Sequence, residues 1–113
     1  MHELQIAEEL AGIVLEVAAN EHLSKVSRVN VSFGQLAGVV PELFETAFQV
    51  TVAGTIAENA ALEIETIPVK LKCSSCNAEY QVKENNFVCE NCGSFEIEII
   101  SGREMYVKNI EGE

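Results

Sequence analysis

Residues 73–93 read CSSCNAEYQVKENNFVCENCG and contain all four cysteines of the chain, as two C-x-x-C pairs separated by twelve residues. A gap of two residues lets both sulfurs of a pair turn toward one ion, and two such pairs complete a tetrahedral shell. Gly93 follows the second pair, where the lack of a Cβ eases the turn that aims backbone N–H groups at sulfur. The pattern predicts a closed, structural zinc site whose ligands are Cys73, Cys76, Cys89 and Cys92.

Two other fates of these cysteines remain open at this point, namely a pair of disulfides and a rubredoxin-like iron centre for electron transfer. Disulfides are disfavoured in a reducing compartment, and the sequence predicts a cytoplasmic protein. Its start carries Glu3, Glu8 and Glu9 where a secretory signal would be basic, and its longest apolar stretch is too short to span a bilayer. Iron fits the same four ligands, but an iron-loaded protein would be red and a zinc-loaded protein colourless, so the colour of the purified protein would distinguish the two metals.

The composition limits the classes of partner. The 113 residues carry 18 acidic and 7 basic side chains, for a formal net charge of −11. This charge repels phosphate backbones and anionic lipid surfaces, so we do not expect a nucleic-acid partner. A zinc-ribbon interaction module is the alternative, but a nucleic-acid version would need a basic stripe, whereas Lys70, Lys72 and Lys83 are outnumbered by nearby glutamates. The sequence also lacks a nucleophile–base set or phosphate loop, so no enzyme is expected.

The flanking segments predict an α+β framework around the cysteine module. Apolar residues at helical spacing predict a helix over residues 4–22 and a second one that starts at Pro41 and stops by Gly54. Alternation predicts strands over 26–33, with Arg28, Asn30 and Ser32 on the outer face, and over 62–66, ended by Pro68. Residues 69–102 read as a small β-rich insertion, with short strands at 79–82 and 95–100. A last strand at 104–110 returns to the first sheet.

The amino terminus carries a second candidate metal site. The large side chain of His2 should prevent removal of Met1, which leaves the imidazole one peptide bond from a free amine. The amine, the following main-chain nitrogens and the imidazole can form fused chelate rings in a plane, a geometry that suits Ni²⁺ or Cu²⁺. The alternative is an ordinary solvated terminus.

Several segments together resemble one family. The chain begins Met1-His2-Glu3 and continues with a glycine-bounded loop, a Pro-Glu-Leu-Phe helix start, an alternating strand and the two cysteine pairs. In this order and combination it resembles the HypA/HybF family of hydrogenase nickel-incorporation metallochaperones. The segments that carry the resemblance are 1–3, 34–39, 41–44, 61–65, 67–69, 92–94 and 101–105.

The resemblance implies a fold and a set of ligands. It implies two helices packed on a three-stranded sheet, over residues 1–68 plus 103–113, with an inserted zinc-ribbon β module at 69–102. Nickel would be bound by the Met1 amine, the His2 imidazole and main chain, and the Glu3 main-chain nitrogen, while the four cysteines hold zinc. The family delivers Ni(II) to the large subunit of [NiFe]-hydrogenase with the GTPase HypB, and some members serve urease maturation.

Overall fold

The computed structural model describes residues 3–82 and 87–113. Within them, the chain divides into two compact units. The first unit comprises the residues up to Ser32, Val39–Glu65 and Met105–Glu113, and the second comprises Phe33–Gly38 and Thr66–Glu104. Among the described residues, no helix has the length and apolar character needed to cross a bilayer.

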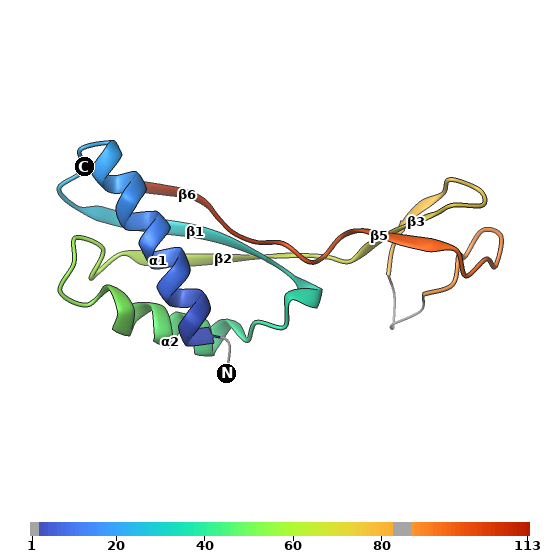
Figure 1. Cartoon of the computed structure of the whole chain (residues 1–113), viewed down its shortest axis with the longest axis horizontal. Helices are drawn as coiled ribbons and strands as arrows, with labels where there is room; N and C mark the ends of the chain where they lie inside the picture. The colour runs from blue at the N-terminus through green and yellow to red at the C-terminus, as the bar shows by residue number, and fades with distance from the viewer. Residues whose placement is uncertain (1–2, 83–86) are drawn as a thin grey trace. The chain divides into compact units, whose positions relative to one another are not determined.

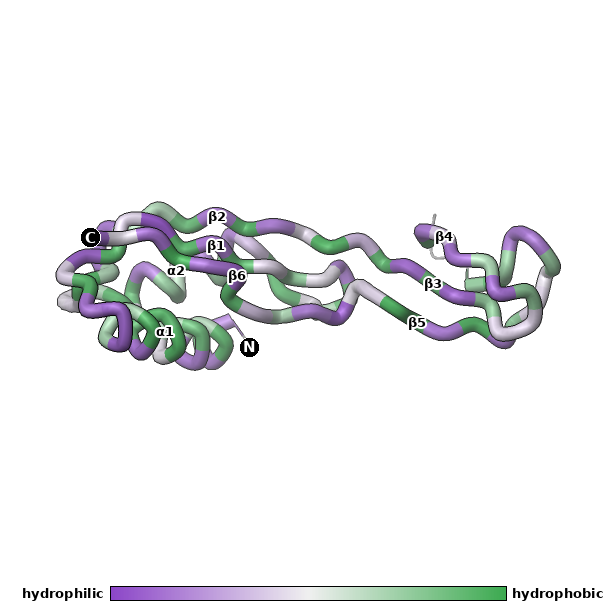
Figure 2. Tube along the Cα trace, turned by 90° about the horizontal axis from the view of Figure 1, so that it is seen from above, coloured by the Kyte–Doolittle hydropathy of each residue, from purple (hydrophilic) through white to green (hydrophobic). Residues whose placement is uncertain are grey.

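The first unit is built from two helices and a three-stranded sheet (Figure 1). Helix α1 spans Glu3–Asn20 and α2 spans Pro41–Val52, and the strand order of the sheet is β2-β1-β6. Both helices lie on one side of this sheet (Figure 2). The bounds of the strands are β1 Val26–Gly34, β2 Ala61–Ile67 and β6 Met105–Gly112. The α+β class predicted from the sequence, including the return of the last strand to the first sheet, is confirmed.

The core of the first unit lies between the helices and the sheet. One stripe of α1 is buried, as periodicity predicted, and so are three positions of α2. The Phe44 and Phe48 rings of α2 lie 5.8 Å apart between centroids, in a tilted arrangement typical of packed aromatic pairs. The principal buried side chains from the helices and β1 are Leu10, Val14, Phe44, Phe48, Val52, Val26, Val29 and Val31.

Strands β1 and β6 are antiparallel. Lys25 and Glu113 exchange two backbone hydrogen bonds, of 3.0 and 2.9 Å, and the Gly34 N–H donates to the Glu104 carbonyl at 2.8 Å. The outer face of β1 is polar as predicted, but Ser32 on it is fully buried. Its hydroxyl donates to Glu65 Oε1 at 3.4 Å, so a small residue on the central strand is covered by the longer side chain of its neighbour.

The second unit contains a smaller sheet of order β4-β3-β5. Its strands are β3 Lys70–Cys73, β4 Glu79–Gln81 and β5 Ile97–Ser101, and both neighbours run antiparallel to β3. The strands expected near 79–82 and 95–100 are therefore present with shifted ends. Strand β3, which the sequence pattern did not single out, is the centre of the sheet because it pairs on both edges.

Residues 33–38 belong to the second unit although they are distant from it in sequence. This segment includes the 3-10 helix η1, Gln35–Ala37. The Leu36 N–H donates to the Gly102 carbonyl at 2.7 Å, and Gln35 Oε1 accepts from the Val69 N–H at 3.2 Å. Gly34 has φ −73°, which any residue can adopt, but a Cβ at this position would overlap the Gly102 carbonyl group. Glycine is therefore required here for space.

We predict that Gly34→Ala destabilises the protein by about 3 kcal/mol or more, because backbone atoms rather than a mobile side chain occupy the space of the new Cβ. Denaturant unfolding of the full chain measures this change. Gly12→Ala is the matched control, since Gly12 is exposed within α1 and its Cβ would meet nothing within 4 Å. It should stabilise by up to about 1 kcal/mol. Equal stability of Gly34→Ala and wild type would contradict the close approach.

Candidate metal centre

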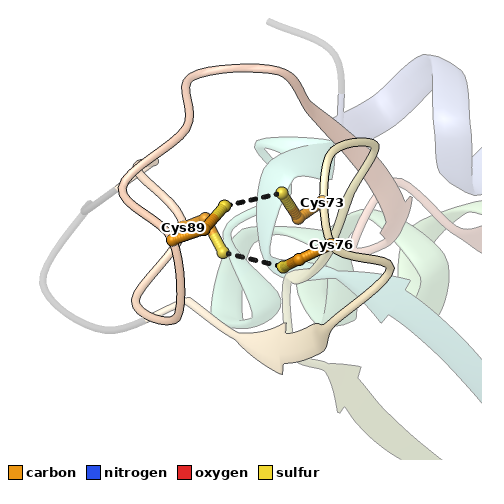
Figure 3. Close-up of side chains that lie close together, drawn as sticks. Cys73, Cys76 and Cys89 are labelled. Atoms are coloured by element: carbon orange, nitrogen blue, oxygen red, sulfur yellow. Dashed lines mark hydrogen bonds between the residues drawn. The ribbon is translucent and has the colours of Figure 1, made fainter.

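The structure brings all four cysteines together in the second unit. Their sulfurs lie within 4.8 Å of one another. Cys73 Sγ is 3.5 Å from Cys92 Sγ, and Cys76 Sγ is 3.6 Å from Cys89 Sγ, so both short contacts join one C-x-x-C pair to the other. In Figure 3, the side chains of Cys73, Cys76 and Cys89 point toward a common centre. The four residues that sequence spacing assigned to one site thus lie around one point.

The two C-x-x-C turns have the same local geometry. In each, the residue after the second cysteine has positive φ, 61° at Asn77 and 73° at Gly93. The N–H of that residue donates to the carbonyl of the first cysteine, at 2.9 Å to Cys73 and 2.8 Å to Cys89. Asparagine and glycine are the residues that tolerate this left-handed conformation best. The turn expected at Gly93 is confirmed, and Asn77, where the polar sequence also predicts a turn, is its counterpart in the first pair.

Backbone and amide donors surround the sulfurs. The pKa of Cys76 is lowered to about 6, first by a hydrogen bond from the Asn91 side chain and then by the Ala78 backbone N–H. Burial raises the pKa of Cys73, but the backbone N–H groups of Cys76 and Ser75 outweigh it, so this pKa is below its usual value. Hydrogen bonds to the charged form favour thiolates. Two of the four thiols are therefore prepared to ionise.

Cys92 has the opposite tendency. The Ser94 N–H lowers its pKa. Hydrogen bonding with Cys73, burial and the remaining thiols together outweigh this effect and raise the pKa to about 12. Hydrogen bonds shared with the neighbouring sulfurs and burial therefore disfavour ionisation of Cys92. A divalent metal ion removes this penalty and allows all four sulfurs to ionise.

The donor set fits a tetrahedral metal ion. Bonds of about 2.3 Å, as in zinc tetrathiolates, place the sulfurs about 3.8 Å apart. The short contacts of 3.5 and 3.6 Å and the upper limit of 4.8 Å bracket this value. All four cysteines are free thiols here, and sulfurs of a disulfide would be about 2.05 Å apart. The geometry supports metal binding rather than two disulfides.

The predicted nickel ligands Met1 and His2 lie outside the described residues. Glu3, which is described, begins α1 and is buried. Its Oε2 accepts a hydrogen bond of 3.2 Å from the N–H of Val40, the N-cap residue of α2. A carboxylate at this position also interacts favourably with the positive end of the α2 dipole. The Glu3 side chain thus has a structural role, which leaves its main chain as the part available to a metal.

The comparisons with known proteins cover the whole chain. The sequence model of the family described as "Hydrogenase/urease nickel incorporation, metallochaperone, hypA" matches residues 1–112. The hydrogenase maturation factor HypA of Aquifex aeolicus is 40% identical over 111 residues, which is 98% of this chain and 96% of that protein. The HypA of Moorella thermoacetica is 37% identical over 113 residues, the full length of both chains.

A solved structure is also similar to this chain. The solution structure of the Ni metallochaperone HypA from Helicobacter pylori superposes with a TM-score of 0.72 at 28% identity, and covers 99% of this chain and 97% of that one. Fold, cysteine cluster and sequence therefore agree, and the chain belongs to the HypA family of hydrogenase/urease nickel-incorporation metallochaperones.

Proposed function

We propose that this protein is a nickel carrier that binds Ni(II) at its N-terminus and delivers it to [NiFe]-hydrogenase during maturation. The observation that carries the proposal is the match of residues 1–112 to the nickel-incorporation family, which includes the Met-His-Glu start. The ligands would be the Met1 amine, the His2 imidazole and main-chain nitrogen, and the Glu3 main-chain nitrogen. The protein would perform no turnover of its own.

The structure around Glu3 supports its proposed role as a main-chain nitrogen ligand. The first four N–H groups of an α-helix lie outside its i→i−4 hydrogen-bond ladder, and Glu3 is the first residue of α1. Ligation through the Glu3 nitrogen therefore costs the helix no bond of that ladder. Meanwhile the Glu3 carboxylate fixes this residue against the start of α2 through Val40. The chelate would thus be attached to an anchored residue.

We further propose that the cysteine cluster holds Zn(II) in a structural role. A tetrathiolate shell leaves no open position for a substrate, which is typical of zinc sites that stabilise a fold. Residues 69–102, which contain this cluster, would form a zinc-ribbon domain. Residues 1–68 plus 103–113 would form the nickel-binding domain. The proposed partners are the large subunit of [NiFe]-hydrogenase and the GTPase HypB, with urease maturation proteins as further candidates, all in the cytoplasm.

His2→Ala should abolish stoichiometric Ni²⁺ binding, because it removes the imidazole and opens one chelate ring. Titration of untagged protein, followed by absorption of the square-planar complex, measures this loss. His22→Ala is the matched control and should bind nickel as wild type does, since His22 follows the end of α1. Zinc content should be unchanged in both variants. Full nickel binding by His2→Ala would refute the N-terminal site.

Nickel affinity should also fall steeply below neutral pH. Binding requires loss of protons from the α-amine, whose usual pKa is about 7.7–8.0, and from main-chain nitrogens. Calorimetry in buffers of different ionisation enthalpy should detect release of more than one proton per Ni²⁺. Extension of the chain before Met1 converts the amine to an amide and should weaken binding similarly. Proton-independent binding would exclude main-chain ligation.

Cys89→Ser should release the metal of the cluster and disorder the second unit while the first unit stays folded. Metal analysis of purified protein and hydrogen exchange in β3 and α1 report on the two effects separately. Ser75→Ala, which changes a residue of the first turn that supplies no ligand side chain, is the control and should retain metal. Wild-type protein should be colourless with one zinc, whereas a red iron-containing protein would favour the rubredoxin-like alternative. Loss of protection in both units would contradict their independence.

A further inference from the structure

Tyr80 has a buried hydroxyl that the fold of the second unit does not use. Less than 1 Å² of its oxygen is accessible, and it has no hydrogen-bond partner among the described residues. A buried polar group without a partner costs free energy and is rare in native proteins. The hydroxyl therefore requires an acceptor that a small shift of the surrounding side chains would bring within reach.

The register of the sheet shows which acceptors are near. Tyr80 on β4 pairs with Leu71 on β3, and Cys73 lies two residues beyond Leu71 on the same face. Tyr80 and Cys73 are thus diagonal neighbours, a spacing that an aromatic side chain can bridge. Leu71, which lies on the same face, is fully buried, so this face points into the interior of the unit.

The buried sulfurs of the cluster are Cys73 and Cys89, with exposed fractions of 0% and 2%. The other two sulfurs belong to the partly exposed Cys76 and the exposed Cys92. Burial raises the pKa of Tyr80, and the negative charges of Cys89 and Cys73 raise it further. The phenol therefore keeps its proton and remains a hydrogen-bond donor.

We propose that Tyr80 is a positioning residue of the metal centre, whose hydroxyl donates a hydrogen bond to the buried thiolate of Cys73 or Cys89 when the cluster holds its ion. This inference rests on the proposed tetrathiolate site. A donor outside the ligand shell lowers the basicity of a thiolate and so resists its protonation and the loss of metal. This hydrogen bond would couple metal retention to the tyrosine.

Tyr80→Phe removes the hydroxyl and keeps the ring that packs in the unit. Tyr106→Phe is the matched control, because Tyr106 is the other tyrosine of the chain and lies exposed on β6 of the first unit. Each full-length variant is loaded with Zn²⁺ or with Co²⁺ as a spectroscopic substitute. The rate of metal loss to excess chelator and the energy of the thiolate-to-cobalt charge-transfer band are then measured.

We expect Tyr80→Phe to weaken metal retention about tenfold, a loss typical for removal of such an outer hydrogen bond. We also expect its charge-transfer band to move to longer wavelength, because an unprotected thiolate gives up electron density more easily. Tyr106→Phe should match wild type in both readouts. A purely structural role of Tyr80 would leave the band in place, and this outcome overturns the proposal. Absence of a four-thiolate cobalt spectrum in wild type would instead overturn the tetrathiolate site and this inference together.

Discussion

The convergence of four thiols on one point is the constraint on which the second unit depends. Among the described residues, the buried apolar side chains of this unit are Phe33, Val69 and Leu71, together with Cys73 and Cys89 themselves. So small an apolar core cannot offset the conformational entropy of ordering the chain, and domains of this size usually need a cross-link. The proposed metal ion, held by both turns, would supply it, since it would close the loop between Cys76 and Cys89.

The first unit obeys a different constraint. Its helices and sheet bury a continuous apolar layer, so we expect it to fold without a metal ion. This independence has a consequence for the proposed nickel site. A carrier has to release its cargo without unfolding, and the proposed chelate uses the α-amine, main-chain nitrogens and an imidazole rather than any side chain of this apolar layer. The two proposed metals thus differ in role. Zinc would stabilise the second unit, whose apolar core is too small, whereas nickel would be attached to the first unit, which has its own apolar core.

Much of this structure follows from local sequence patterns. The helical stripes, the strands and the joint site of the four cysteines depend on periodicity and spacing, which are visible in one sequence. The burial of Ser32, the pairing of β3 on both edges and the close approach of Gly34 to Gly102 depend on neighbours far along the chain, so the local pattern did not reveal them. Tyr80 is the same kind of case, since only the register with Leu71 places it beside Cys73. The ligand roles of Met1, His2 and Glu3 stay predictions.

The charge of the cluster is met by dipoles rather than by cations. Within the described part of the chain, the ion pairs of Arg28 and Lys108 with glutamates all lie in the first unit. The donors at the sulfurs are neutral backbone N–H groups and the Asn91 amide. Dipoles stabilise thiolates without neutralising them, so four thiolates around a divalent ion keep a net negative charge. Loading the cluster therefore preserves the acidity of the chain, which favours encounter with positively charged partner surfaces.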